Sequence, residues 1–418
     1  MLKLANEALA AAQEEARTTP LDRFDVSRAR LFAQDVHRPF FERLRREAPV
    51  HYCADSEFGP YWSISTYEAI MAVDTDHRRF SSASGIFIGE RDSEFNPRSF
   101  IGEDAPLHAK WRKPAMPAVA PNRLGDLETL MRGRIGAVLD GLPVGEEFDW
   151  VERVSVEITT QMLATLFDFP WEDRAKLPYW SDVVTATPLV GNDTLDKYER
   201  RDILLECLAA FQTLWNARKD GPPAFDFITL MAQHPDTADL ADDPFNLLGN
   251  LMLLIVGGND TTRNSISGGV LALNRFPDQY ERLKADPSLI PNMVSEIIRW
   301  QTPLAYMRRT ALEDVELGGQ TIRAGDKVVM WYVSGNRDEA KFADADSLDI
   351  ARRNARNHIS FGYGVHRCMG NRVAEMQLRL VWEEILKRFS HVEVVGEPER
   401  VTSNFVLGYA SLPVRLHA

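Results

Sequence analysis

A single cysteine near the C-terminal end of the chain stands between a glycine-rich loop and a helix-forming segment. The loop runs from Phe361 to Gly370 with the sequence FGYGVHRCMG, and its cysteine is Cys368. Helix formers without a proline follow as far as Phe389, which predicts a helix over 368–389. Unpaired amides at the start of a helix favour negative charge, so the pattern predicts a thiolate with a lowered pKa. Such a thiolate is a candidate metal ligand, and a buried structural cysteine is the alternative.

A second unusual group follows the longest apolar run of the chain. The run Leu251–Val256 leads into two glycines, an asparagine, Asp260 and Thr261. Each glycine inside a helix costs about 1 kcal/mol relative to alanine. Close contact between two helices would account for the glycines alone. An acid beside an alcohol in a buried helix indicates a functional purpose, because burying a carboxyl group is costly.

The cysteine pattern Phe-x-x-Gly-x-His-x-Cys-x-Gly resembles the haem-binding loop of the cytochrome P-450 superfamily, and the resemblance extends over nearly the whole chain. It implies a haem b cofactor whose iron has Cys368 as its axial ligand, the thiolate that favours O–O cleavage in this family. It also implies that Phe361 packs beside the sulfur and that Gly370 leaves room for the macrocycle. The expected activity is that of a haem-thiolate monooxygenase, which uses O2 to oxidise a C–H bond.

The same resemblance assigns the acid and the alcohol to oxygen activation. It implies that Gly257 lies at a helix distortion with room for O2, that Thr261 donates a hydrogen bond to bound oxygen, and that Asp260 relays protons from solvent. A peroxide-using haem-thiolate enzyme would not need this acid–alcohol pair. A non-catalytic haem sensor would not need a substrate-sized cavity beside it. The pair therefore favours the O2-dependent enzyme over these two alternatives.

Four cationic or hydrogen-bonding residues match the positions that hold the haem propionates in this family. They are His108, Arg112, Arg309 and His366. His108 and Arg112 are four residues apart, so both can reach one side of a helix, and guanidinium groups suit carboxylates. Surface charge is the alternative for each residue taken alone.

A further match to the family is a three-residue ion network. Glu296 and Arg299 share a helix face, and the resemblance adds Arg352 as the third member. Most such pairs are solvated surface pairs, which is the alternative. The family match implies a structural role, in which the network supports the cysteine loop.

Composition excludes several classes of protein. The chain has 418 residues, 44% of them hydrophobic and 26% charged, with a net charge of −13, which argues against general nucleic-acid binding. No apolar run is long enough to span a bilayer, and no secretory signal is evident, so no membrane anchor is expected. The cysteines Cys53, Cys207 and Cys368 form no disulfide framework. We therefore expect a cytoplasmic protein.

Helical periodicity dominates the chain. Segments with 3.6-residue apolar spacing and plausible caps are 38–47, 67–73, 123–139, 151–166, 198–219, 244–275, 277–284, 289–300 and 368–389. Strand signals are short, and they fall at 51–52 and 61–64, at 315–317 and 320–322, and at 327–331. The expected fold class is mainly α with small β-sheets, and the resemblance implies the cytochrome P-450 fold of one triangular prism.

We expect one domain over 1–418, because no linker-like run marks a boundary. Its parts are a β-containing N-terminal part at about 20–85, a helical haem-binding part at about 105–310, and a C-terminal part with β-structure and the cysteine loop at about 311–418.

Apolar residues of several segments are expected to face a hydrophobic substrate, with ordinary core packing as the alternative. They are Ile86, Phe87, Ile88, Leu253, Val256, Leu304, Val406 and Leu407. The stretches 105–114 and 358–360 resemble a bacterial branch of the superfamily that hydroxylates alkanes, fatty acids and related chains at the terminal carbon. That reaction is expected here, and a terpenoid or other compact hydrophobic substrate is the alternative.

No dinucleotide, flavin or iron–sulfur motif is found in the sequence. Electrons are therefore expected from a ferredoxin, which is itself reduced by a separate ferredoxin reductase. A basic cluster around the cysteine loop is the expected docking site for an acidic ferredoxin. Its residues are Lys113, Arg352, Arg353, Arg356, His358, Arg367 and Arg372.

Overall fold

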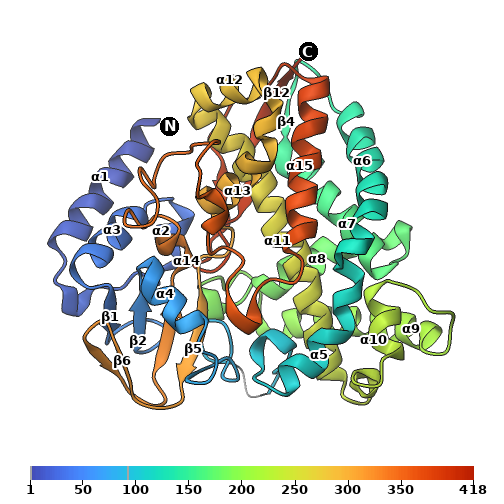
Figure 1. The fold of residues 1–418 in the computed structure, drawn as a ribbon, viewed down its shortest axis with the longest axis horizontal. Coiled ribbons are helices and arrows are strands. Elements are labelled where there is room, and N and C mark those ends of the chain that lie inside the picture. The colour runs from blue at the N-terminus through green and yellow to red at the C-terminus, as the bar shows by residue number, and fades with distance from the viewer. Residues whose placement is uncertain (1, 92–93) are drawn as a thin grey trace.

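Helices make up most of the molecule, and the main sheet lies to one side of them (Figure 1). The computed structural model describes residues 2–91 and 94–418. Its α-helices are α1 (Leu2–Thr18), α2 (Ala29–Ala33), α3 (Arg38–Glu47), α4 (Tyr67–Asp74), α5 (Leu107–Ala115), α6 (Leu124–Asp140), α7 (Glu157–Phe167), α8 (Lys176–Thr185), α9 (Lys197–Arg218), α10 (Phe227–Gln233), α11 (Pro244–Arg275), α12 (Pro277–Ala285), α13 (Ile290–Gln301), α14 (Tyr332–Gly335) and α15 (Asn371–Arg388). None of the helices in these ranges is long and apolar enough to cross a membrane.

The longest predicted helices are present with nearly the predicted bounds. Helices α3 and α11 have the predicted bounds, and α9 is displaced by one residue at each end. The predicted segment 151–166 is divided into a π-helical turn at Val151–Val156 and helix α7. The pattern does not predict α1, α8 or α10.

The main sheet has five strands in the order β1-β2-β8-β5-β3. The strands are β1 (Val50–Cys53), β2 (Tyr61–Ile64), β3 (Phe80–Ser81), β5 (Met307–Ala311) and β8 (Lys327–Met330). Strands β1 and β2 form the predicted antiparallel hairpin, and β2 pairs with β8 in parallel. The sheet therefore joins the N-terminal part of the chain to the segment that follows α13.

Three smaller sheets complete the β-structure. Strands β4 (Glu147–Asp149), β12 (Pro413–His417) and β9 (His391–Val394) form one sheet, and β10 (Glu399–Arg400) pairs with β11 (Tyr409–Ser411). Strands β6 (Val315–Leu317) and β7 (Gln320–Ile322) form the other predicted hairpin. Its turn uses Gly318 and Gly319, which both have a positive φ.

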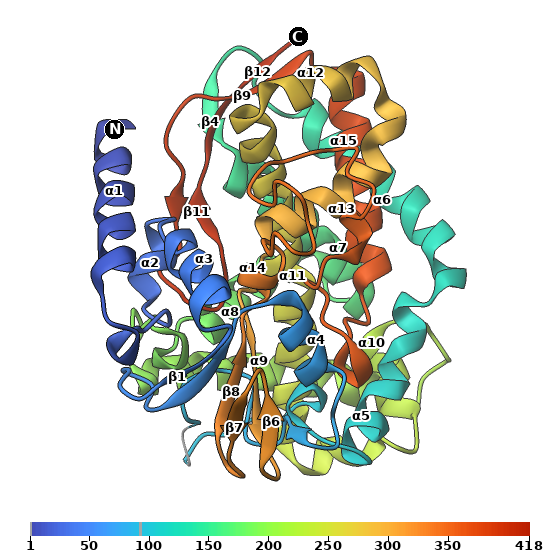
Figure 2. The same ribbon diagram turned by 60° about the vertical axis from the view of Figure 1, so that its left-hand side comes forward.

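Helix α11 lies in the middle of the helical part, where both views show it surrounded by other helices (Figures 1 and 2). It contacts α7, α8, α13 and α15. Most of its side chains are buried, as expected for a helix that is apolar on several faces. Helix α15 begins three residues after Cys368, and its packing on α11 and α13 fixes the cysteine loop beside the core.

Candidate active site

The cysteine loop turns tightly before α15 begins. The Cys368 amide donates a hydrogen bond to the Phe361 carbonyl over 2.8 Å, which closes the loop. Gly362 and Gly364 have φ values of +63° and +66°, a conformation that other residues rarely adopt. The amides of Gly370 and Asn371 donate to the sulfur, as expected at the start of a helix. The Cys368 side chain retains exposed surface.

The expectation of a lowered thiol pKa is wrong for the protein alone. Burial raises the pKa of the Cys368 thiol, and this influence outweighs the opposing amides and the charges of Arg112 and Arg367. The amides and positive charges that stabilise the thiolate are the kinds of group that the sequence predicts. Desolvation of the sulfur by the surrounding loop is the larger effect on the thiol pKa, although part of the side chain surface remains exposed.

Two imidazoles from distant parts of the chain meet beside the loop. The ring centroids of His108, on α5, and His366 are 4.4 Å apart. Burial lowers the pKa of His108 to about 4 and that of His366 to about 2, so both rings are neutral at neutral pH. His366 Nε2 lies 3.0 Å from Ser82 Oγ. The other nitrogens, His108 Nε2 and His366 Nδ1, are buried and have no hydrogen-bond partner among the described residues.

Two guanidinium groups border the same imidazoles. Arg112, also on α5, donates to the Arg367 carbonyl, and burial lowers its pKa. Arg309, on β5, is 97% buried, and its charge lowers the pKa of both histidines. The structure thus brings together all four residues that were assigned to the propionates.

The acid and the alcohol of α11 have different surroundings. Asp260 is fully buried, whereas Thr261 is partly exposed. Thr261 Oγ1 donates to the Gly257 carbonyl one turn earlier, over 3.1 Å. The expected helix distortion is absent from the described residues of α11, which is α-helical from Pro244 to Arg275. The Gly257 carbonyl accepts a hydrogen bond from the threonine hydroxyl in addition to its ordinary helix hydrogen bond, so the helix does not have to unwind.

Asp260 is linked to the surface by residues that the sequence analysis missed. Arg263 Nη2 lies 3.0 Å from Asp260 Oδ1 and 2.5 Å from Asp182 Oδ1, on α8. Ser181 and Asn259 also donate to Asp260 Oδ1. Burial raises the pKa of Asp260, and Arg263 opposes that rise. The spacing of Asp260 and Arg263, three residues apart on one helix, is the signal that could have identified this pair.

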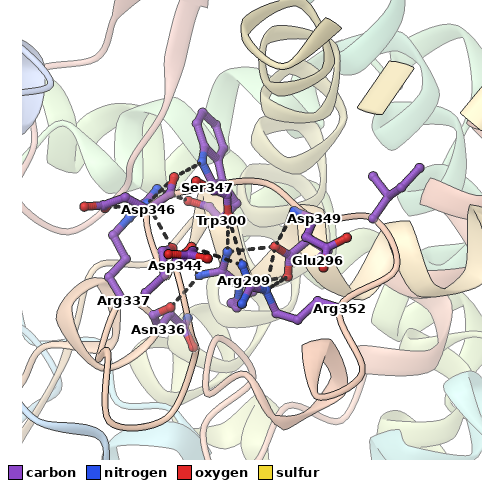
Figure 3. Close-up of polar contacts among 12 residues, drawn as sticks. Glu296, Arg299, Trp300, Asn336, Arg337, Asp344, Asp346, Ser347, Asp349 and Arg352 are labelled. Carbon is purple, nitrogen blue, oxygen red and sulfur yellow. Dashed lines mark hydrogen bonds and ion pairs between the residues drawn. The ribbon is translucent and has the colours of Figure 1, made fainter. Parts of the chain in front are cut away.

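The Glu296 network is present, as Figure 3 shows, and its three side chains are almost fully buried. Arg299 Nε and Nη2 each donate to a different oxygen of Glu296, over 2.8 Å. Arg352 Nε donates to the same carboxylate over 3.0 Å. Arg299 also donates to the carbonyls of Asn336 and Ala345, so the network ties α13 to the segment that precedes the cysteine loop.

The proposed substrate residues fall into two groups. Ile86, Ile88, Val406 and Leu407 are buried in one apolar cluster, with Phe87 and Leu304 packed against it. Leu304 and Val406 are joined by an isolated β-bridge. Leu253 packs against the main core, and Val256 is partly exposed on the same helix. Ile88 has no exposed surface, so in this conformation its side chain belongs to the core.

One face of α11 retains exposed surface in the middle of the helix, where most of the other side chains are buried. Leu253, Val256 and Thr261 are partly exposed, and Gly257 is exposed. Their spacing of three or four residues places them on one side of the helix. A Cβ built on Gly257 or on Gly370 would meet no atom within 4 Å. This helix face and the cysteine loop thus both leave open space.

The donor set fits an iron porphyrin. It comprises one thiol with exposed surface, two guanidinium groups and two buried imidazole nitrogens without partners. A thiolate is an axial ligand for haem iron, and the cations and donors suit two carboxylates. Among the described residues no group of three or more His, Cys, Asp and Glu side chains could hold a bare metal ion.

Comparison with known proteins gives a consistent result. The family model described as Cytochrome P450 matches residues 198–416. Linalool 8-monooxygenase of Pseudomonas putida is 37% identical over 95% of this chain and 99% of its own. A methyl-branched lipid omega-hydroxylase of Mycobacterium bovis is 31% identical over 91% of each chain. The solved structure of CYP153D17 from Sphingomonas sp. is 48% identical, covers 96% of this chain and 100% of that chain, and has a TM-score of 0.88.

Proposed function

The chain belongs to the cytochrome P450 family and is a haem-thiolate monooxygenase, and we propose that it hydroxylates the terminal carbon of an alkane, a fatty acid or a related chain. A haem held in this site would supply the activation of O2. Cys368 would provide a thiolate ligand to its iron. His108, Arg112, Arg309 and His366 would hold the propionates, and Phe361 and Gly370 would lie beside the macrocycle.

Proton delivery is assigned to residues of α11. Asp260 is buried, yet Arg263 connects it to Asp182, whose side chain is 57% exposed. A proton from solvent therefore has a polar route to Asp260. Thr261 lies next to it on the helix face that retains exposed surface, where its hydroxyl can orient a water molecule and pass a proton on.

The observation that supports a hydrophobic substrate is the composition of that exposed face. Leu253, Val256 and Gly257 present no hydrogen-bonding side chain, and Thr261 is the only polar member of the group. Phe87 and Leu304 add partly buried apolar surface from two other segments. A site of this kind holds a ligand by apolar burial.

Two relatives bear on the position of attack. One is named as an omega-hydroxylase of methyl-branched lipids, which favours terminal attack on a chain. The other is named as a linalool 8-monooxygenase, and it makes a compact terpenoid the second candidate substrate. We favour terminal hydroxylation over terpenoid hydroxylation because residues 105–114 and 358–360 resemble the bacterial branch that hydroxylates chains at the terminal carbon.

The test is a panel of alkanes, fatty acids and terpenes, scored by the low-to-high spin shift of the ferric haem and by product regiochemistry. The proposal expects a spin shift with chains and oxygen at the terminal carbon. Val256→Ala should increase the share of subterminal product, since it widens the approach. Val270→Ala, fully buried on the same helix, is the control for lost packing. Preference for terpenes, or subterminal products from the unaltered enzyme, would contradict terminal hydroxylation.

The electron donor that we propose is an acidic ferredoxin served by a separate reductase. The proximal basic cluster, defined as Lys113, Arg353, Arg356, Arg367 and Arg372, is exposed around the cysteine loop. Arg352 and His358 were expected in it, but both are buried and are excluded from the docking surface. A cytoplasmic location follows as part of the proposal, because ferredoxin and three unpaired cysteines belong in a reducing compartment.

A further inference from the structure

A buried carboxylate at the end of α4 links two parts of the haem site. Asp74 is 97% buried. Its Oδ1 accepts a hydrogen bond from Arg309 Nη2 over 3.0 Å. Its Oδ2 accepts from the Tyr363 amide over 2.8 Å and from the Tyr332 hydroxyl over 2.9 Å. One side chain therefore contacts a proposed propionate ligand and the cysteine loop at the same time.

The loop is built to approach Asp74 closely. Gly364 lies against the end of α4, and a Cβ there would come within 2.7 Å of the Asp74 carbonyl oxygen. A Cβ on Gly362 would lie 3.4 Å from Asp74 Oδ2. Both glycines have a positive φ, so a side chain at either position would be strained as well as crowded. The glycines before Cys368 thus serve contact with Asp74 as well as the turn itself.

The orientation of Arg309 depends on the same carboxylate. Its Nη2 is held by Asp74, and its Nη1 donates to the Arg308 carbonyl over 2.9 Å. Both side chains of the pair are at least 97% buried, so neither charge is stabilised by solvent. Burial raises the pKa of Asp74, while Arg309 and the two other donors oppose that rise. Three donors converge on the two oxygens, an arrangement that suits the charged form.

We propose that Asp74 is a positioning residue. It fixes the orientation of Arg309, the proposed propionate ligand, relative to the loop that carries Cys368. This inference rests on the proposed haem site. Asp74 contacts neither reacting atoms nor substrate, and it acts through Arg309 and the Tyr363 amide. Because Arg309 is shared between Asp74 and a propionate, the negative charge of Asp74 also contributes to the electrostatic environment of the iron.

The experiment compares Asp74→Asn with Asp35→Asn in the haem-loaded protein. Asp35 is a matched control, since it is largely buried and pairs with Arg275 and Arg400. Haem release to an apoglobin acceptor and the reduction potential of the iron are measured beside thermal stability. Asp74→Asn should release haem roughly 10- to 100-fold faster, the range typical of losing an outer-shell partner. The reduction potential of the haem iron in this variant should become more positive, because the negative charge of Asp74 is removed.

A second pair of variants tests whether Asp74 acts through Arg309. Arg309→Met should shift the potential in the opposite direction, and the effects of Asp74→Asn and Arg309→Met on haem release should be non-additive in the double variant. The proposal is overturned if Asp74→Asn leaves haem release and potential unchanged, or if Asp35→Asn changes them equally. Failure of the proposed function is distinguishable, since the unaltered protein would then show no thiolate-ligated haem spectrum.

Discussion

At the scale of single residues, the chemistry depends on two neighbours in α11 with different exposure. Asp260 is buried and ion-paired, whereas Thr261 lies on the partly exposed face and its hydroxyl donates to the Gly257 carbonyl. That hydroxyl can turn to a ligand at little cost, because the helix bond to Gly257 does not depend on it. Asp260 keeps its position through three donors on one oxygen.

Thr261→Ala should divert reducing equivalents from product into peroxide. The variant lacks the hydroxyl that we propose positions the proton, so product formed per electron supplied should fall several-fold while electron consumption continues. The measurement is the ratio of peroxide to product. Thr262→Ala is the matched control, since Thr262 is 97% buried and points to the core. Unchanged coupling in Thr261→Ala, with Thr261→Ser also unchanged, would remove Thr261 from the mechanism.

Local motifs and the family resemblance pointed to the candidate site residues, but neither pointed to Asp74 or Asp182. Cys368, Asp260 and Thr261 each lie in a short sequence motif that already indicates their chemistry. Asp74 is 235 residues from Arg309, and it has no motif around it. Asp182 meets Arg263 only because α8 packs across α11. Contacts of this kind depend on tertiary packing, which periodicity does not report.

At the scale of elements, the clarity of the helical pattern decided what the sequence could predict, and length alone did not, since α1 has 17 residues and was missed. Helices α3, α9 and α11 have long periodic patterns or clear caps, so their bounds were predicted to within one residue. Helix α10 has seven residues and is buried on most sides, so it shows little periodicity. The pairing of β5 with β8 and of β2 with β8 was not predicted either, since pairing between strands far apart in the sequence depends on tertiary packing.

The buried network on α13 gives a stability prediction. Glu296→Gln leaves the charges of Arg299 and Arg352 without a buried counter-charge, which should cost about 3–5 kcal/mol of unfolding free energy. Denaturant unfolding of the haem-loaded protein measures it. Glu393→Gln is the control, because Glu393 forms exposed pairs with Arg415 and His417 and should cost about 1 kcal/mol or less. Equal losses in the two variants would contradict a structural role for the network.

At the scale of the whole molecule, charge is distributed unevenly. The net charge is −13, yet the proximal basic cluster surrounds the cysteine loop. Arg356, Arg367 and Arg372 lie close enough to Glu375 to oppose the rise that burial causes in its pKa. A basic patch on an acidic protein attracts an acidic partner to one face and repels it from the rest.

Replacing Arg356 and Arg367 with glutamine should therefore lower ferredoxin-driven turnover and reduce its dependence on salt. The effect should appear as a higher KM for ferredoxin with little change in substrate binding, because the substrate spin shift does not involve this face. Arg23→Gln, an exposed arginine outside the cluster, is the control. If turnover and its salt dependence stay at the level of the unaltered enzyme, the cluster is not the docking site.

The central claim is that Cys368 binds haem iron as a thiolate, and the spectrum of the reduced protein with carbon monoxide tests it most directly. The account predicts a Soret band strongly shifted to the red in the unaltered protein. Cys368→His should abolish that band while leaving the protein able to bind haem. A carbon monoxide complex of the unaltered protein without the red-shifted band would contradict thiolate ligation, and with it the assignment of the site.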